Sequence, residues 1–515
     1  MSELTRAEMM ADLTCLLGYL SSAHPDPYRA AGGPVPFYRL AARIAEELPA
    51  RADRNTFLRR LRPLVALVQD GHTTIRGPAD PSNPRRLWLD FGIVEQTLYV
   101  RQVYELKHRP LLGARIRAVG GEAIPAVSAR VRATVGSDNA LDVLLRLIGA
   151  FQDPALAAAV FGERALEPVA FELERVDGRV ETVAVPWSEA PPGPPLAPAS
   201  RLPRPALGPG RMGWGFLDPE GRVACIRFAE LMRYREAAET WRHSGYRRGL
   251  DDWYREENGR PPEPGEVDSF IASRPSATDL LVAMMNAIEA QKTPWVIVDA
   301  SECPGGTSTF AYILAWFLFG EEAVVQLDEG YQIPRYSTLY EDNYGQIPDP
   351  AALACGGYDF RHENAWRQRR YGAADAKARE DEWREWLASV PTFERVAMSE
   401  TLPRPRPRVI VVTGAETYSA GFDVAVVLRK LGATHVGVPS AQAPNCFIDG
   451  LAYTLPHSGL TGTISFKESF WFPEEALFDR ILTPHVVLTY DAAKRYGFDP
   501  AAGVRLAIDA VVKAP

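Results

Sequence analysis

The stretch 408–430, RVIVVTGAETYSAGFDVAVVLRK, constrains the fold more than any other part of the chain. Residues 409–413 form an apolar, β-branched run with the length of a buried parallel strand. After a short turn, Ser419-Ala420-Gly421 opens a segment whose apolar residues have helical spacing. This pattern places a serine at a helix N-terminus, where free N–H groups and the helix dipole favour developing negative charge. The position suits a nucleophile, and it equally suits an ordinary serine N-cap.

Bulk properties exclude several classes of protein. The 515-residue chain has a formal net charge of −8 and therefore no basic footprint for nucleic acid. Its five cysteines are scattered and show no metal-site spacing, which favours reduced thiols in a cytoplasmic protein. No secretory signal is evident, and no apolar run has the length of a membrane span. We expect a cytoplasmic protein without nucleic-acid or membrane partners.

The first part of the chain, residues 1–80, is predicted to be a helical bundle. Three segments carry leucines and other apolar residues at helical spacing, and the third runs into the turn Asp70-Gly71-His72. A histidine in such a turn can act as a general base. It can also lie on the surface while the aspartate and glycine satisfy the turn.

The next part, residues 81–186, is predicted to be rich in β-strands, as in a PDZ-like or cap domain. Two alternating runs flank Asp177-Gly178, which is a strong hairpin signal. A Pro-rich linker follows at 187–210 and marks the clearest boundary in the chain.

Residues 211–515 are predicted to form an α/β core. The buried strand 295–299 is followed by the turn Cys303-Pro304-Gly305-Gly306 and a helix, which repeats the strand–turn–helix arrangement around Ser419.

Two charged and aromatic insertions, at about 231–275 and 348–391, interrupt this core. We expect them to be lids over the active site, with an oligomer contact as the alternative. The tryptophans of the second insertion are predicted to pack between helices rather than to bind a ligand; they are Trp366, Trp383 and Trp386.

Four segments in this order together resemble one family. They are Asp70-Gly71-His72-Thr73, residues 296–299 with Gly305-Gly306, Ser419-Ala420-Gly421, and the tail 484–499. The sequence resembles the C-terminal processing, or tail-specific, serine peptidases, in the branch that includes the tricorn core and chlamydial protease-like activity factor. The resemblance implies a crotonase-like ββα core and no metal or organic cofactor.

The resemblance also implies which residues act. One branch of the family uses a lysine downstream of the serine, and residues 436–447 contain none. The other branch uses a histidine in an Asp-Gly-His turn, which implies Ser419 as nucleophile and His72 as base. His457 is the next candidate for the base.

Two further elements of the site follow from the same resemblance. The backbone amides of Gly305, Gly306 and Ala420 are the implied oxyanion donors. In this branch a late glutamate supports the histidine. That glutamate is replaced here, and Asp479 is the nearest carboxylate that could orient His72, with Glu474 and Glu475 as alternates.

The predicted function is hydrolysis of a peptide or related amide bond by acyl transfer, with a peptide-like substrate as partner and a homo-oligomer as a further possibility. Two alternatives stay open at this point. One is a hydrolase of a small peptide-like or acylated metabolite, and the other is a non-catalytic protein that binds a hydrophobic ligand on the same fold.

Overall fold

The computed structural model describes residues 3–77, 85–162, 167–345, 376–399, 402–403, 405–473 and 480–513. Most of the second predicted insertion therefore lies outside the described residues, including Trp366. The three carboxylates proposed from sequence as the third catalytic residue, Glu474, Glu475 and Asp479, also lie outside them.

A six-stranded, mostly parallel sheet forms the centre of the C-terminal part. Its strands, in spatial order, are β12 (Met212–Phe216), β13 (Val223–Phe228), β14 (Trp295–Asp299), β16 (Arg408–Thr413), β17 (Thr434–Gly437) and β20 (Val486–Val487). β12 is antiparallel to β13, and every other neighbouring pair is parallel. The two strands predicted at 295–299 and 409–413 are thus confirmed, and they are direct neighbours.

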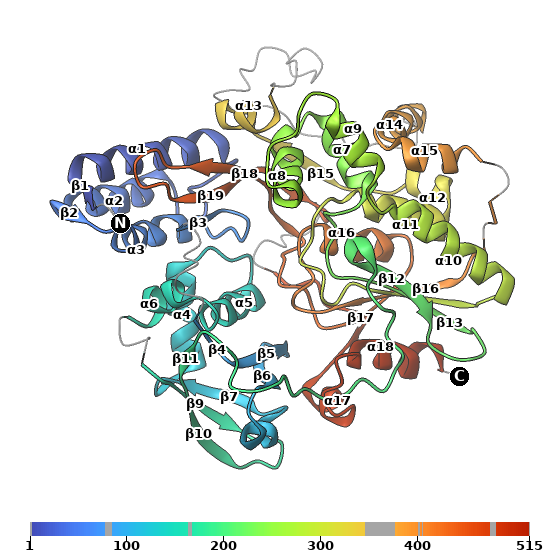
Figure 1. Ribbon diagram of the computed structural model, residues 1–515, viewed down its shortest axis with the longest axis horizontal. Helices are drawn as coiled ribbons and strands as arrows, with labels where there is room; N and C mark the ends of the chain where they lie inside the picture. The colour runs from blue at the N-terminus through green and yellow to red at the C-terminus, as the bar shows by residue number, and fades with distance from the viewer. Residues whose placement is uncertain are drawn as a thin grey trace.

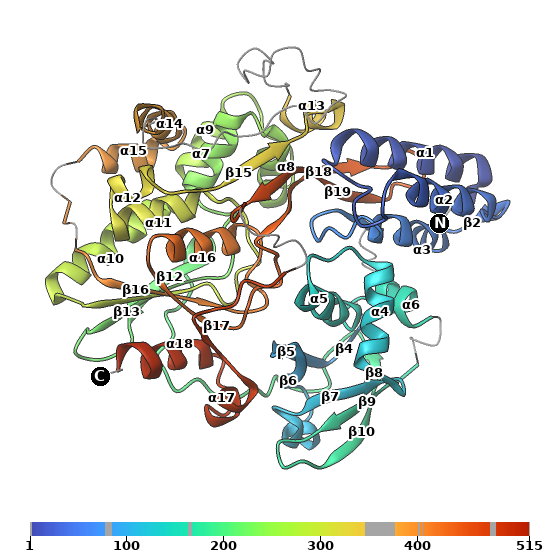
Figure 2. The same cartoon turned by 180° about the vertical axis from the view of Figure 1, so that it is seen from behind.

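Both faces of this sheet are covered, because successive side chains of each strand enter different cores. In β14, Val296 and Val298 pack on one face while Ile297 packs on the other. Figure 2 shows α11 (Thr309–Phe319) and α16 (Ala420–Lys430) on one side of the sheet and α18 (Ala502–Ala507) on the other. Outside the two insertions and α15, which follows the second of them, the other described helices of this part are α10 (Ala277–Gln291), α12 (Glu321–Val325), α13 (Thr338–Tyr344), α17 (Tyr490–Arg495) and a terminal π-helix at Ile508–Val512.

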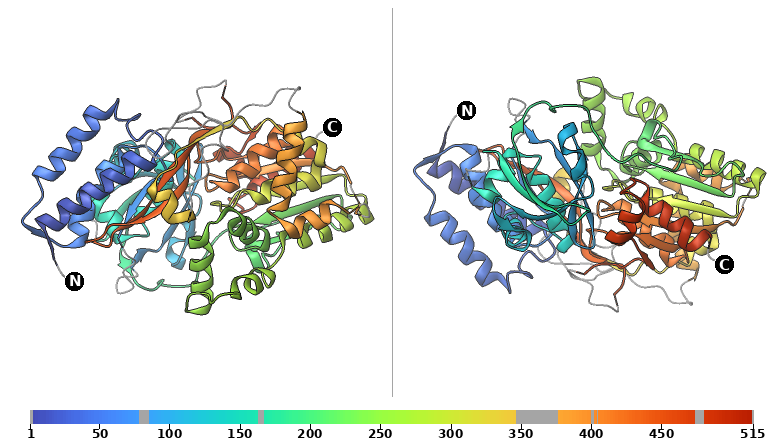
Figure 3. Two further views of the ribbon diagram at one scale, coloured as in Figure 1. Left: turned by 90° about the horizontal axis from the view of Figure 1, so that it is seen from above. Right: turned by 90° about the horizontal axis from the view of Figure 1, so that it is seen from below.

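The three predicted N-terminal helices are present as α1 (Arg6–Ala23), α2 (Pro34–Glu46) and α3 (Arg54–Ala66), and a two-stranded pair, β1 (Leu4–Thr5) with β2 (Arg51–Ala52), ties their ends. Their apolar faces pack on a long hairpin, β18 (Asn445–Thr454) and β19 (Thr461–Phe470), from the C-terminal part. Figure 1 shows this hairpin reaching from the core to the helices, and Figure 3 shows the helices at one end of the molecule.

The hairpin also carries the strand that follows the Asp-Gly-His turn. β3 (Thr74–Arg76) pairs antiparallel with β19, and β15 (Tyr331–Pro334) pairs with another part of the same strand. Residues far apart in the chain are therefore joined at the loop that carries His72.

The middle region contains the predicted antiparallel strands. Its six-stranded sheet comprises β5 (Leu89–Val94), β6 (Thr97–Val103), β7 (Arg115–Val119), β8 (Glu122–Ala123), β9 (Val169–Glu174) and β10 (Val180–Val185). The hairpin predicted around Asp177-Gly178 joins β9 to β10. Helices α4 (Ile124–Thr134), α5 (Ala140–Ala150) and α6 (Pro154–Phe161) accompany the sheet, with a 3₁₀ turn at Leu106–Leu111. The Pro-rich linker begins with β11 (Trp187–Ser188), which pairs with β4 (Arg86–Leu87), and ends in a 3₁₀ turn at Pro209–Arg211.

The first insertion is helical, with α7 (Arg235–Ser244), α8 (Arg247–Asn258) and α9 (Glu266–Ala272) around a small apolar cluster of their own. The described end of the second insertion forms α14 (Ala376–Ala388) and leads into α15 (Pro391–Ala397). There Trp383 stacks on Trp386 at 4.8 Å between ring centroids, and Trp386 packs against Phe393. These two tryptophans are packing residues, as predicted.

Within the described ranges, no single helix combines the length and the apolarity of a membrane span; α5 and α6 meet that test only when the bent pair is taken together.

Candidate active site

Ser419 lies at the junction of β16 and α16, in a backbone conformation that ordinary caps do not use. It is the N-cap of α16, with φ 51° and ψ −128°. A positive φ is uncommon outside glycine and is retained only where surrounding structure enforces it. Within the described residues its side chain makes no capping hydrogen bond. The ordinary N-cap interpretation therefore does not describe this serine, and its hydroxyl is left for another partner.

Hydrogen bonds to the core enforce this turn. The Tyr418 amide donates to the Cys303 carbonyl at 2.9 Å, and the Asp423 amide donates to the Ser419 carbonyl at 3.0 Å. The buried side chain of Gln442 accepts the amide of Ser419 itself. Gln442 lies in the lysine-free segment 436–447, and nothing in the sequence marks its contact with the serine.

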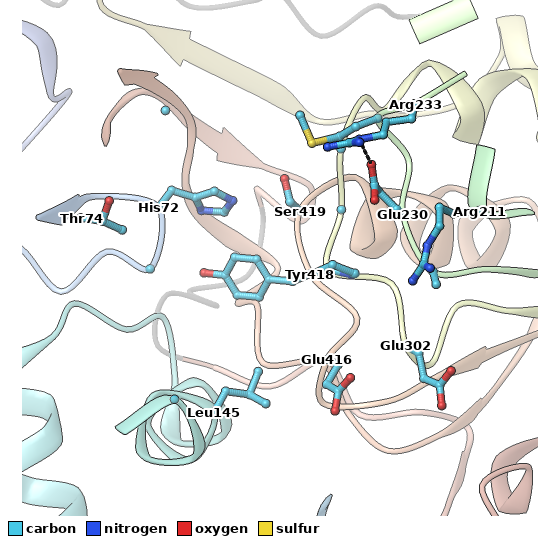
Figure 4. Close-up of a pocket in the computed structure, with 18 of the residues that line it drawn as sticks. His72, Thr74, Leu145, Arg211, Glu230, Arg233, Glu302, Glu416, Tyr418 and Ser419 are labelled. Carbon is cyan, nitrogen blue, oxygen red and sulfur yellow. Dashed lines mark ion pairs between the residues drawn. The ribbon is translucent and has the colours of Figure 1, made fainter. Parts of the chain in front are cut away.

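His72 faces the serine from the loop between α3 and β3, and Figure 4 shows its ring directed toward Ser419. The ring packs on Tyr418, with 4.9 Å between centroids, and its side chain is 14% exposed. Neither ring nitrogen has a hydrogen-bond partner among the described residues. Burial lowers the pKa of His72, and the nearby Asp70 charge opposes that shift only in part. The imidazole is therefore neutral at pH 7 and can accept a proton.

Three buried aspartates lie behind His72. Asp70 Oδ1 accepts the His72 amide at 2.9 Å and is 4.0 Å from His72 Nδ1. Asp138 accepts the Gly71 amide at 2.7 Å and the Tyr418 hydroxyl at 2.6 Å, so it joins the loop of the histidine to the turn of the serine. Asp142 pairs with Arg146 at 3.0 Å.

This hydrogen-bonded link through Asp138, between the loop of His72 and the turn of Ser419, was not predicted. Burial raises the pKa of Asp138 well above its usual range, and the charges of Asp142 and Asp70 add to the effect. A buried carboxyl with two donors is a strong positional anchor, because a change at either partner leaves a buried polar group unpaired.

The predicted oxyanion turn lies against the serine. A Cβ atom at Gly305 would be 2.5 Å from Ser419 Cβ and 3.1 Å from the Ala420 amide nitrogen. Leu231 bonds to the residues on either side of Gly306, through Gly305 O at 2.9 Å and Thr307 N at 2.7 Å. In this parallel bridge the N–H of Gly306 points away from Leu231. The amide of Ala420 is in the first turn of α16, where N–H groups have no intrahelical acceptor.

Ser419, His72, Gly305 and Gly306 all line one cleft of about 1810 Å³. Its wall is assembled from every part of the chain: the opening segment, helices α5 and α6, the linker, the core and the first insertion. Trp241, Trp253 and Met232 bring apolar surface from the first insertion to this wall. The described residues of the second insertion do not line it.

The other sequence candidates lie elsewhere. His457 is exposed at the tip of the β18–β19 hairpin, where its amide donates to Asp12. The structure does not describe Asp479, Glu474 or Glu475. Among the described carboxylates, Asp70 is the one in contact with a ring nitrogen of His72. The sequence signal for Asp70 was its place in the Asp-Gly-His turn, which was interpreted as turn chemistry alone.

Asp70, His72 and Asp138 also offer ligand atoms within 4.8 Å of one another, close enough to hold a metal ion. The donor set argues against that use. Asp138 is already held by two donors, and Asp70 accepts from Thr73 as well as from the His72 amide.

Comparison with known proteins places the fold. The chain is similar to mature CPAF in complex with lactacystin, with a TM-score of 0.59 and 14% identity over 98% of each chain. It is similar to mature CPAF without that compound, with a TM-score of 0.58, 14% identity and the same coverage. A photosystem II D1 C-terminal processing protease gives a TM-score of 0.42 at 12% identity over 94% of each chain. No protein-family model and no curated protein matches the sequence. The fold resemblance predicted from the motifs is therefore confirmed by solved structures, along nearly the whole chain.

Proposed function

We propose that the protein is a serine hydrolase that cleaves peptide or related amide bonds by acyl transfer. The observation that carries this proposal is the pairing, in one cleft, of a strained serine without a capping bond and a neutral histidine whose ring nitrogens are unpaired within the described structure. The shared fold with CPAF, over 98% of both chains, supports the same reaction class.

Each residue has a defined part in this proposal. His72 takes the proton of the Ser419 hydroxyl as the oxygen attacks the carbonyl carbon of the substrate. The negative charge then forms on the carbonyl oxygen, beside the amides of Gly306 and Ala420 at the N-terminus of α16. The imidazolium of His72 returns the proton to the leaving amine, which departs and leaves an acyl-serine. Water, deprotonated by the same ring, releases the acid and restores the hydroxyl.

The cleft favours a peptide over the two alternatives. Its volume of about 1810 Å³ exceeds the roughly 300–1,000 Å³ of pockets for small ligands, so it accommodates several residues of an extended chain. Its wall carries many charged groups, among them Arg76, Arg101, Arg211, Glu230 and Glu416. A wall with so many charges is unsuited to an apolar ligand.

The first insertion supports restricted access to the site. α7 and α8 reach the cleft, and Arg233 connects their base to the wall through Glu230 at 3.4 Å and Glu256 at 2.7 Å; Figure 4 shows the Arg233–Glu230 pair. We infer a lid that limits substrates to short or unfolded chains.

Labelling with a fluorophosphonate probe, followed by mapping of the modified residue, tests the proposal. Modification is expected at Ser419 and is expected to be lost in Ser419→Ala and His72→Ala. Ser301→Ala is the matched control, because Ser301 lies two residues after the neighbouring strand β14 and its hydroxyl bonds only to Asp299 among its described contacts. Labelling that persists in Ser419→Ala refutes the nucleophile.

A further inference from the structure

A second histidine, His24, lies buried behind the site at the C-terminal end of α1. Its Nδ1 accepts the amide of Asp26 at 3.1 Å. A backbone amide can only donate, so Nδ1 carries the lone pair and the proton of the neutral ring is on Nε2. That nitrogen is 3.3 Å from Oδ2 of Asp70. The backbone after α1 thus fixes the tautomer in which His24 donates to Asp70.

Asp70 is the group between the two histidines. Its Oδ2 accepts from His24 and from the Thr73 hydroxyl, while its Oδ1 accepts the amide of His72 and faces His72 Nδ1 at 4.0 Å. Burial acts to raise the pKa of Asp70, but the hydrogen bond from His24 leads the interactions that lower it overall. A fully buried carboxylate with this many donors stays ionised at neutral pH.

The remaining charges around His72 largely cancel. Asp449 faces the ring but is paired with Lys467 at 2.7 Å. Asp142 also faces it and is paired with Arg146 at 3.0 Å. Asp138 faces Asp70. Because the pKa of Asp138 is raised and that of Asp70 is lowered, Asp138 is protonated at a higher pH than Asp70. Among the described residues, Asp70 is left as the uncompensated negative charge beside the ring.

We propose that His24, Asp70 and His72 form a relay in which Asp70 stabilises the imidazolium of His72 and His24 positions Asp70. This inference rests on the proposed function, since it assigns the electrostatic partner of the proposed base. No proton crosses the relay. His72 gains the proton of Ser419, Asp70 remains a carboxylate, and His24 keeps its Nε2–H bonded to Asp70 throughout.

Substitutions of His24 separate positioning from simple packing. His24→Gln places an amide NH₂ near the position of Nε2 and retains the donor to Asp70. His24→Asn retains an acceptor near the position of Nδ1, for the Asp26 amide, and loses the donor to Asp70. The two variants are close in size and polarity, so each is the matched control of the other.

The assay is the rate of fluorophosphonate labelling of the full chain as a function of pH, with thermal unfolding measured for every variant. His24→Asn is expected to lower the rate at pH 7 by about tenfold, as for the loss of one hydrogen bond to a charged group, and His24→Gln is expected to restore most of it. Asp70→Asn is expected to lower the rate by about 10² or more. Asp70→Asn should also move the acid limb of the pH–rate profile to lower pH, because removal of the negative charge lowers the pKa of His72.

Each result has one meaning. Equal rates for wild type and His24→Asn overturn the relay, and so do equal losses in His24→Asn and His24→Gln, which indicate packing alone. If His24→Asn does not fold, Thr73→Val removes the other side-chain donor to the same oxygen and is expected to lower the rate in the same direction; an unchanged rate overturns the relay. Failure of the wild type to label at Ser419 refutes the proposed function instead, and is read independently of these variants.

Discussion

Gly305→Ala tests whether the proposed oxyanion turn and the proposed nucleophile, Ser419, are in direct contact. The added Cβ would lie 2.5 Å from Ser419 Cβ and 2.8 Å from the Tyr418 carbonyl oxygen. Both are atoms of the backbone or directly attached to it, so the clash is relieved only if one of the two turns moves. The φ of +119° adds backbone strain of about 1–3 kcal/mol for any residue with a side chain.

The expected effect on activity exceeds the effect on stability. A shift that restores ordinary contact moves the reacting oxygen or its amide donors by a sizeable fraction of an ångström. A displacement of about 1 Å costs roughly 10²-fold in rate, and loss of one oxyanion donor costs about 10²–10³. We therefore expect the labelling rate of Gly305→Ala to fall by about 10² or more.

Gly432→Ala is the matched control, because this glycine also has a positive φ, of +99°, but has no atom within 4 Å of an added Cβ. It carries comparable backbone strain at the end of α16 without the clash. Wild-type labelling in Gly305→Ala would refute the close contact. An equal loss in Gly432→Ala would assign the effect to destabilisation, and thermal unfolding of both variants checks that the fold is retained.

Three further predictions concern groups around the site. Tyr418→Phe removes the bond to Asp138 and is expected to lower the labelling rate about tenfold; an unchanged rate would show that this bond does not position the turn. Burial raises the pKa of Asp423 to about 6, above the ordinary value of 3.8. The folded state therefore binds the proton more tightly, and the contribution of Asp423 to stability falls as pH rises from about 4 to about 6. Relative to wild type, the free energy of unfolding of Asp423→Asn in urea should rise by roughly 2 kcal/mol between pH 4 and pH 7, and a constant difference would contradict this. Arg233→Ala, which frees α8 from its ion pair through Glu256, is expected to increase cleavage of folded proteins relative to short peptides, and an unchanged ratio would count against the lid.

The core was predictable from the sequence because its signals are local. Strand β14 begins and ends at the residues expected from the run at 295–299, and β16 includes the run at 409–413. A buried parallel strand must be apolar on both faces, so it is visible as a continuous apolar run. The serine at the following turn could be located for the same reason.

The contacts that hold the turn of the serine and the loop of His72 in place could not be predicted, because they join side chains of distant segments. Tyr418 and Asp138 are 280 positions apart, and His24 and Asp70 are 46 apart. Hydrophobic periodicity says which face of an element is buried but not which polar groups share that burial. The positive φ of Ser419 is likewise set by its tertiary contacts and not by the propensities of its neighbours.

The same limit explains the N-terminal helices. Their periodicity predicted three amphipathic helices and suggested that they pack on one another, since an apolar stripe must be covered. The stripe does not specify what covers it. Here the cover is the β18–β19 hairpin, which is nearly 400 residues away in the sequence, as the bond between Thr74 and Thr463 at a separation of 389 illustrates.

This arrangement has a consequence for how activity is lost. The proposed nucleophile, Ser419, is built on β16 and α16 in the buried core. The proposed base, His72, depends on a loop anchored to β19 through the bond from the Thr463 hydroxyl to the His72 carbonyl at 2.6 Å. The pairing of β3 with β19 spans only residues 74–76. A short edge strand opens at lower free energy than the core sheet does. Weakening this pairing, for example by a proline in place of Ile75, should therefore remove the base while the nucleophile and its sheet stay folded.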